Sequence, residues 1–225
     1  MKKIFLSAAL FSLIIISMSM LTAKKTRIVF FGDSITQAGV KKGGYIDRIQ
    51  TAVNEKGLQN KYDLVGAGIG GNKVYDLYLR MDDDVMTRKP QVVFIYVGIN
   101  DVWHKKTSGT GTDIDKYEKF YVAIIKKLQA KKIEVIVCTA TVIGEKKNGA
   151  NPQDADLDKY SDVIRRLATT YNCKLVDLRK LFAEYEIENN PDDKESGILT
   201  TDRVHLTDAG NQLVAEEMMK ALSIR

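Results

Sequence analysis

The chain has 225 residues, of which 44% are hydrophobic and 28% charged, and 34 Lys and Arg residues stand against 29 Asp and Glu residues. This length is enough for one domain with a sizeable core, and the composition excludes disordered, collagen-like and polytopic membrane proteins. Basic residues are interleaved with acidic ones rather than clustered, so we expect no nucleic-acid partner.

The N-terminus carries a leader-like pattern, in which two lysines precede an apolar segment over residues 4–21 and Ala23 follows. This pattern is typical of a secretory signal peptide. We therefore expect residues 1–23 to be a signal peptide and residues 24–225 to form the functional domain. The mature protein would be periplasmic or extracellular, with no stable membrane association. The alternative is a retained N-terminal anchor, because the apolar segment is close to the length that spans a bilayer.

Short β-branched apolar runs alternate with longer amphipathic stretches after this leader. Each apolar run is too short for a helix, and apolar spacings of three and four mark the amphipathic stretches as helices. The predicted strands cover residues 27–31, 62–65, 91–97, 133–139 and 174–177, and the predicted helices cover residues 45–56, 73–88, 114–128, 156–171 and 207–223. The strands lie far enough apart for β-helix-β crossovers. The pattern predicts one α/β domain, a three-layer α/β/α arrangement around a parallel sheet.

Three polar, glycine-containing loops are expected at residues 104–112, 144–156 and 189–199. Ligands of open α/β sheets bind at the carboxyl ends of the strands. These loops would therefore rim a ligand site.

The first strand breaks into Gly32-Asp33-Ser34, which puts a hydroxyl group at the carboxyl edge of the sheet. A glycine permits a tight turn there, and a serine beside a helix N-terminus has backbone N–H groups close by. The alternative is that Asp33 or Ser34 only caps the following helix.

The second strand ends in a glycine-rich segment, residues 66–72, which lacks the lysine and serine of a phosphate-binding loop. We therefore expect these glycines to form a turn. The third strand ends in Gly98-Ile99-Asn100-Asp101. The carboxamide of Asn100 can donate hydrogen bonds into a cleft, or it can serve the turn alone.

Trp103 and an acidic triplet are two further features of this part of the chain. Trp103, the single tryptophan, could form a platform for a sugar ring or pack beneath its loop. Asp82, Asp83 and Asp84 stand together on a predicted polar helix face, where a solvated surface is expected rather than a metal site.

The two cysteines, Cys138 and Cys173, fall late in one predicted strand and just before the next. They would lie about 15 Å apart at about 3.3 Å per residue, beyond the reach of a disulfide. We therefore expect two free thiols. With two histidines and no C-x-x-C motif, the chain also supplies few ligands for structural zinc.

Asp202 and His205 stand three residues apart before the last predicted helix, which Thr207 could cap. At this spacing a carboxylate can hold one imidazole nitrogen and leave the other free as a base for a serine nucleophile. His104 lacks such a partner. A lone His205 would more often be an ordinary structural histidine.

In order and context, these motifs resemble the four sequence blocks of the SGNH hydrolases, also called the GDSL esterase and lipase family. The resemblance covers residues 24–225. It implies that Ser34 is the nucleophile, His205 the base and Asp202 the residue that orients His205. It also implies a flavodoxin-like five-stranded parallel sheet of strand order 2-1-3-4-5.

The resemblance further implies an oxyanion hole, formed by the N–H groups of Ser34 and Gly68 and the side chain of Asn100. Strands 2, 1 and 3 are neighbours in this order, so their carboxyl ends would bring the three donors together. Family members often have asparagine where this chain has Gly66, so the local loop geometry can differ.

These features predict an exported serine esterase that hydrolyses small acyl esters, acetyl esters above all, on carbohydrate through an acyl-serine intermediate. We expect no metal and no organic cofactor. A lysophospholipase or thioesterase would use the same residues but would need an apolar acyl channel, which the polar loops do not obviously supply. A catalytically silent glycan-binding module is the alternative from another class.

Overall fold

Five short segments, of which β1, β3 and β4 are rich in β-branched or aromatic residues, pair as parallel strands in the order β2-β1-β3-β4-β5. This computed structural model describes residues 24–224, so the signal peptide expected at residues 1–23 lies outside the described residues. The sheet confirms the predicted fold class and strand order. Its members are β1 (Thr26–Gly32), β2 (Tyr62–Gly68), β3 (Val92–Tyr96), β4 (Glu134–Cys138) and β5 (Lys174–Val176).

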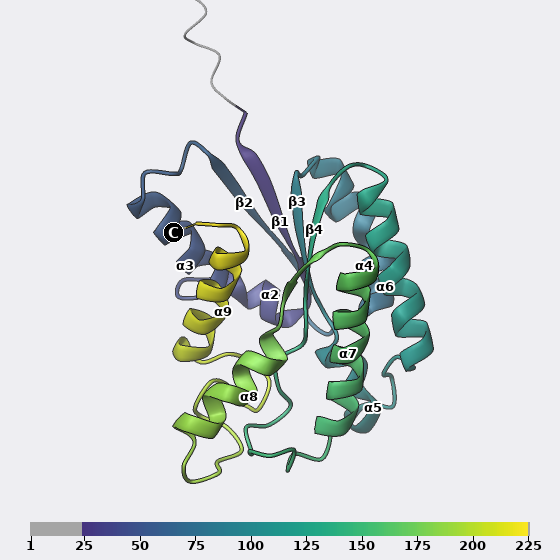
Figure 1. Cartoon of the computed structure of the whole chain (residues 1–225), viewed down its shortest axis with the longest axis vertical. Helices are drawn as coiled ribbons and strands as arrows, with labels where there is room; N and C mark the ends of the chain where they lie inside the picture. Colours follow the sequence, from purple (N-terminus) through teal and green to yellow (C-terminus); the bar gives the residue numbers. More distant parts are fainter. Residues whose placement is uncertain (1–23, 225) are drawn as a thin grey trace, which may run out of the picture.

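Helices cover both faces of the sheet, with α3 and α9 on one side and α4, α6 and α7 on the other (Figure 1). Within residues 24–224 the helices are α2 (Ser34–Gly39), α3 (Tyr45–Glu55), α4 (Val74–Asp84), the 3-10 turn η1 (Met86–Arg88), α5 (Ile99–Thr107), α6 (Ile114–Gln129), α7 (Asp154–Thr170), α8 (Leu178–Asn189) and α9 (Asp208–Ala221).

Helices α5 and α8 were not among the predicted elements, and α2 was expected only as a short helix after Asp33 or Ser34, without bounds. Residues 104–107, expected in a loop, continue α5, and residues 154–156 begin α7. Both missed helices bury polar side chains, Asn100 and Asp101 in α5 and Arg179 and Glu186 in α8. Their inner faces therefore lack the apolar periodicity that identifies a helix in the sequence.

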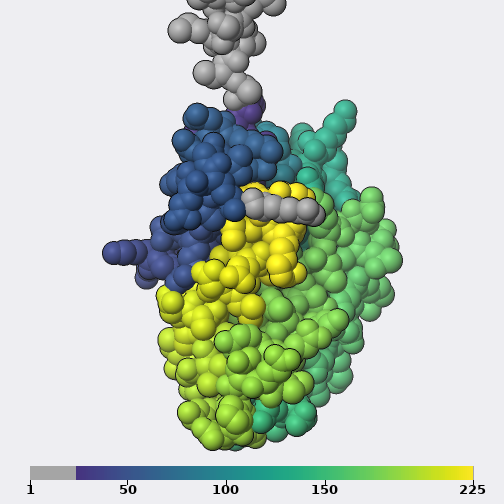
Figure 2. All heavy atoms as spheres, turned by 60° about the vertical axis from the view of Figure 1, so that its left-hand side comes forward, coloured from purple at the N-terminus to yellow at the C-terminus, as the bar shows by residue number. Residues whose placement is uncertain are grey.

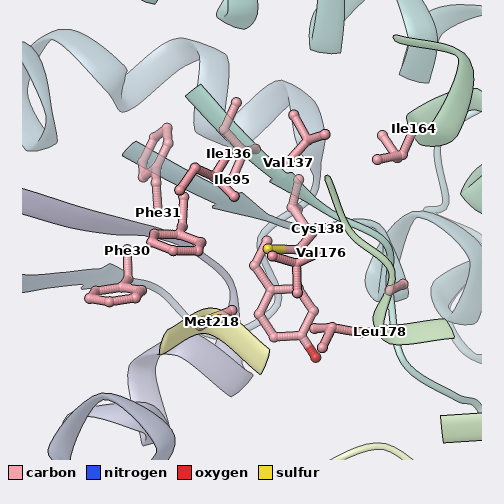
Figure 3. Packing of buried hydrophobic residues seen from close by; sticks show 14 of the residues in the cluster. Phe30, Phe31, Ile95, Ile136, Val137, Cys138, Ile164, Val176, Leu178 and Met218 are labelled. Carbon is pink, nitrogen blue, oxygen red and sulfur yellow. The ribbon is translucent and has the colours of Figure 1, made fainter. Parts of the chain in front are cut away.

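Successive residues of β1 pack on opposite faces of the sheet, as the strand pleat requires. Phe30 stacks on Phe94 of β3 with ring centroids 4.9 Å apart and meets Tyr45 of α3 at 5.9 Å. Phe31 lies beneath the guanidinium of Arg80 on α4, 4.6 Å from the ring centroid. Figure 3 shows such buried side chains on both sides of the strands. The buried sheet thus holds the carboxyl ends of β1, β2 and β3 in place.

The last helix, α9, returns to the first half of the chain. Figure 2 shows it, in yellow, beside the blue segments that include α3. The Tyr45 N–H donates to Asn211 Oδ1 at 2.9 Å. Thr207 caps the helix as predicted, since its hydroxyl accepts the Gly210 N–H at 3.1 Å. This docking fixes the segment that leads into α9.

Both cysteines are free thiols, as expected. Cys138 pairs in register with Val176, whereas Cys173 lies three residues earlier and outside β5. Separately, none of the helices in residues 24–224 combines the length and apolar character needed to cross a membrane.

Candidate active site

Ser34, His205 and Asp202 meet at the carboxyl end of β1. Ser34 is the first residue of α2, directly after β1, and His205 lies in the loop before α9. The Ser34 Oγ atom is 3.0 Å from His205 Nε2, and His205 Nδ1 is 2.7 Å from Asp202 Oδ2. The structure therefore brings together the three side chains that the sequence analysis selected, in an unbroken chain of hydrogen bonds.

The Asp202 carboxylate is held by its own loop. Its Oδ1 atom accepts the backbone N–H groups of Val204 at 3.1 Å and of His205 at 2.8 Å. Burial acts to raise the pKa of Asp202, but the hydrogen bonds from the backbone and ring of His205 outweigh it and lower the pKa. An ionised Asp202 accepts the proton on Nδ1, so Nε2 is left with a lone pair toward Ser34.

Glu145 anchors the segment that precedes this loop. Its side chain is fully buried, and its carboxylate accepts the backbone N–H groups of Ile198 at 2.9 Å and Leu199 at 2.7 Å, together with the N–H and hydroxyl groups of Thr200. The neighbouring Gly144 N–H donates to the Arg203 carbonyl at 2.8 Å. Sequence reasoning missed Glu145, because no local motif marks it.

The glycine-rich segment after β2 forms a turn beside Ser34. The Asn72 N–H donates to the Ile69 carbonyl at 3.3 Å, and Gly71 has a φ of +76°, which suits glycine at the third position of such a turn. A Cβ atom at Gly70 would lie 4.0 Å from Ser34 Cβ. No backbone acceptor within the described residues takes the N–H of Gly70 or Gly71, and Gly70 is the one of the two that lies next to the serine.

Gly68 does not occupy the position expected of an oxyanion donor. The Ile69 N–H donates to the Gly32 carbonyl at 3.3 Å, and because N–H groups alternate along a strand, the Gly68 N–H points away from β1. A Cβ atom at Gly68 would lie 2.1 Å from Gln37 N. Gly68 therefore allows α2 to approach β2 closely, and the turn at Gly70 and Gly71 reaches Ser34 instead.

Gly66 has a comparable packing role. A Cβ atom at Gly66 would lie 2.3 Å from Cγ1 of Val40, so asparagine at this position would collide with the residue that ends α2. The side chain of Val40 therefore occupies the space that an asparagine side chain at position 66 would need.

Asn100 lies next to the glycine turn, as the strand order predicts. Its side chain is buried, and Nδ2 donates to the Asn72 carbonyl at 3.0 Å. This bond uses one of the two amide protons. The second amide proton, the Ser34 N–H and the free N–H groups of the turn are the donors available at this edge of the sheet.

Two buried acids flank these donors. Asp33 caps α2, since Oδ1 accepts the Ile35 N–H at 3.0 Å, which confirms the capping interpretation for Asp33. Burial raises the pKa of Asp33 to about 7, and the charge of Asp101 adds to this effect. Burial likewise raises the pKa of Asp101 to about 6, although its carboxylate accepts the Val74 N–H. Both carboxyl groups support the backbone around the site.

Trp103 lies against the candidate base. Its ring meets the His205 ring edge-on with centroids 6.4 Å apart and meets the His104 ring at 5.5 Å. Burial lowers the pKa of His104, and the charge of Lys73 lowers it further. Trp103 belongs to α5 and is partly buried against the core, so it packs from this helix onto the core and also borders the site.

The acidic triplet lies away from Ser34, on α4. Asp82 pairs with Lys127 and Asp84 with Arg80, each at 2.6 Å. Within residues 24–224 no group of three or more His, Cys, Asp or Glu side chains could hold a metal ion.

Comparisons with known proteins identify the family and the relatives of this chain. Residues 30–213 match the model of the GDSL-like lipase/acylhydrolase family. The crystal structure of an acetyl xylan esterase, AlAXEase, shows a TM-score of 0.86 and 57% identity, covering 87% of this chain and 99% of that one. An acetylxylan esterase of Geobacillus stearothermophilus is 28% identical over 213 residues, 87% of this chain and 93% of that protein. A lipoprotein of Bacillus subtilis is 26% identical over 217 residues, 84% of this chain and 86% of that protein.

Proposed function

The chain belongs to the GDSL-like lipase/acylhydrolase family, and we propose that it is an exported enzyme that removes acetyl groups from carbohydrate, with acetylated xylan as the substrate class. It is a carboxylic-ester hydrolase of the SGNH/GDSL type. The single observation that carries the proposal is the hydrogen-bonded chain from Ser34 through His205 to Asp202.

In the proposed reaction, Ser34 is the nucleophile and His205 the general base. The Oγ atom attacks the acetyl carbonyl carbon while Nε2, 3.0 Å away, takes the hydroxyl proton. The imidazolium then gives this proton to the departing sugar oxygen as the ester bond breaks, which leaves acetyl-serine. Water attacks the acetyl-serine with His205 again as base, and acetate leaves.

Asp202 orients the imidazole in this proposal. Its 2.7 Å contact with Nδ1 supports the tautomer in which Nε2 can accept a proton. The lowered pKa of Asp202 keeps the carboxylate charged opposite the imidazolium that forms during attack. The ring is thus held in one orientation through both half-reactions.

The negative oxygen that forms during attack would be stabilised by the Ser34 N–H, by Asn100 Nδ2 and by a backbone N–H of the Gly70–Gly71 turn. The exposed turn and the buried, anchored amide of Asn100 support this arrangement. Fixed donors stabilise the transition state without reorganisation, and each contributes about 3–4 kcal/mol. The turn takes the place that the sequence analysis assigned to Gly68.

The substrate class rests on the relatives, two of which are acetyl xylan esterases that align along nearly their whole length. Export rests on the leader pattern of residues 1–23; the lipoprotein relative is compatible with it. The side chains that border the site are open to solvent in part, with 37% of His205 and 52% of Asp202 exposed. Such an open site suits acetyl groups on a polymer.

The test compares wild-type protein with Ser34→Ala on acetylated xylan, with released acetate as the readout. We expect acetate release by wild-type protein alone, and covalent labelling by a fluorophosphonate at Ser34. No release from xylan, combined with rapid hydrolysis of a lysophospholipid or an acyl thioester, would replace the carbohydrate substrate with the alternative. Failure of the fluorophosphonate to label would instead favour the binding module.

A further inference from the structure

Arg80 of α4 joins the carboxyl ends of β1 and β2. Its guanidinium lies over Phe31, 4.6 Å from the ring centroid, and Nη2 donates to the carbonyl oxygens of Gly32 at 2.7 Å and Ala67 at 3.0 Å. The side chain is only 15% exposed. Gly32 stands two residues before Ser34, so this cation ties the strand that carries the nucleophile to its neighbour.

The same guanidinium holds the glycine turn. Its Nε atom donates to Asn72 Oδ1 at 2.6 Å, and Nη1 donates to Asp84 Oδ2 at 2.6 Å. The backbone carbonyl of Asn72 in turn accepts the Asn100 Nδ2 proton at 3.0 Å. One side chain therefore contacts both the strand before Ser34 and the residue that orients Asn100.

We propose that Arg80 is a positioning residue for the oxyanion site, an inference that rests on the proposed function above. Arg80 does not touch the substrate. It sets the distance between the Ser34 N–H, the Gly70–Gly71 turn and Asn100, because its rigid planar fork holds acceptors on β1, on β2 and in the turn at once, besides Asp84 of its own helix. Fixed spacing matters here, since a misplacement of about 1 Å can cost about 100-fold in rate.

Arg27 provides a matched control at the opposite end of the same two strands. Its Nε atom donates to Asp63 Oδ2 at 2.6 Å, and Nη1 donates to the Arg88 carbonyl at 2.6 Å. Arg27 thus also links β1 to β2, but it does so at their amino ends. A general loss of strand pairing would affect both arginines, whereas an effect on the oxyanion site is specific to Arg80.

The experiment compares Arg80→Lys with Arg27→Lys in hydrolysis of p-nitrophenyl acetate. Lysine keeps the charge but cannot reach several acceptors in one plane. We expect Arg80→Lys to lower kcat about 10- to 100-fold with KM within about twofold of wild type. Arg27→Lys should retain kcat within about twofold. Thermal unfolding and counting of phosphonate-labelled serine show how much of each variant is folded.

A boronic acid, whose trigonal boron becomes tetrahedral when Ser34 Oγ adds to it, supplies the readout that a purely structural role would not change. Its adduct with Ser34 carries an oxygen in the oxyanion site, so its inhibition constant should rise by the factor by which kcat/KM falls. Millimolar guanidinium should restore part of the activity of Arg80→Ala. Wild-type kcat and boronate affinity in folded Arg80→Lys would overturn the proposal.

Asn72→Ala gives a second test that spares the strand contacts of Arg80. If Arg80 acts partly through Asn72, the double variant with Arg80→Lys should lose less activity than the product of the two single losses. Strictly multiplicative losses would contradict that link. The Ser34→Ala variant separates this inference from the proposed function. If Ser34→Ala is inactive and Arg80→Lys is fully active, only the role of Arg80 is refuted. If Ser34→Ala is active, the proposed mechanism itself is refuted.

Discussion

The Ser34 hydroxyl and the His205 imidazole lie 3.0 Å apart although 171 residues separate them in the chain. Strand β1 delivers the serine and the loop before α9 delivers the histidine. Each side chain has a second constraint, since α2 begins at Ser34 and Asp202 holds His205. The pair is thus fixed from both sides before any substrate binds.

Ser34→Ala should lower kcat by a factor on the order of 10⁴ to 10⁶ and leave the thermal transition nearly unchanged, because a part-buried hydroxyl at the edge of the sheet contributes little to the core. His205→Ala should lose a similar factor. His104→Ala is the matched control, and most of its turnover should remain because the His104 ring lies beside Trp103 rather than Ser34. If His104→Ala were the inactive histidine variant, the base would be assigned to the wrong residue.

Gly68→Ala should destabilise the fold. The new Cβ atom would lie 2.1 Å from Gln37 N and 2.7 Å from the Asp33 carbonyl oxygen, and backbone atoms cannot rotate away. Overpacking of this kind costs about 1–3 kcal/mol or more in the free energy of unfolding, measured by urea denaturation. Gly57→Ala is the control: with a φ of +69° and nothing within 4 Å, it carries only backbone strain of about 1–2 kcal/mol. Equal stability of Gly68→Ala and wild type would contradict the close approach of β2 and α2.

Glu145→Gln should weaken the anchor of the loop that carries His205. The carboxylate accepts four hydrogen bonds from Ile198, Leu199 and Thr200, and the amide nitrogen of glutamine would turn a donor toward donors. Bonds to a charged acceptor contribute about 1.5–3 kcal/mol each, so a clear fall in the midpoint of thermal unfolding is expected. Glu184→Gln on the exposed side of α8 should have little effect. An unchanged midpoint in Glu145→Gln would show that the loop holds its position without the carboxylate.

The sequence was informative where local patterns carry the structure. The strands could be predicted because buried parallel strands are continuous apolar runs, and the Asp202 and His205 pair could be recognised because the two residues share one short loop. Helices α5 and α8 could not be predicted, since buried Asn100, Asp101, Arg179 and Glu186 interrupt their apolar faces.

The roles of Glu145 and Arg80 could not be predicted from the sequence, because their partners lie far away in the chain. Glu145 finds its donors more than 50 residues away, and Arg80 reaches a carbonyl 48 residues earlier; nothing near either residue marks these partners. The choice of Gly68 differs from the turn proposed above for another reason. The direction of an N–H group reverses at every residue of a strand, so it depends on a register that the glycine-rich sequence leaves open.

Glu186 provides a prediction about pH and stability. Its side chain is buried, its Oε1 atom has no hydrogen-bond partner within the described residues, and burial together with the charge of Glu145 raises its pKa from 4.5 to about 8. Between these values the folded protein keeps a proton that the unfolded chain releases, so this group lowers the free energy of unfolding as the pH rises.

Glu186→Gln has no proton to release and should escape this penalty. We expect it to be more stable than wild type by about 1–3 kcal/mol at pH 8, with a difference that shrinks toward zero at pH 4. Urea denaturation at the two pH values measures the effect. A constant difference between the two proteins at all pH values would mean that Glu186 titrates normally in the folded state.

The acyl group that the enzyme accepts follows from the residues around Ser34. The turn beside it has Gly70 and Gly71 at its centre and the exposed Ile69 before them, Asn100 lies on one side, and Asp202 and His205 are partly open to solvent. Ile69 and Trp103 offer apolar surface there, but Ile69 is a single side chain and Trp103 packs against His205. A long acyl chain would find little apolar surface to bury against, although each buried CH₂ group would contribute about 0.8 kcal/mol in a closed channel.

We therefore expect kcat/KM to be higher for p-nitrophenyl acetate or butyrate than for the octanoate or palmitate ester. Efficiency that climbs steadily beyond eight carbons would replace the carbohydrate esterase with a lipase or thioesterase, and Ser34, Asp202 and His205 would keep their proposed roles.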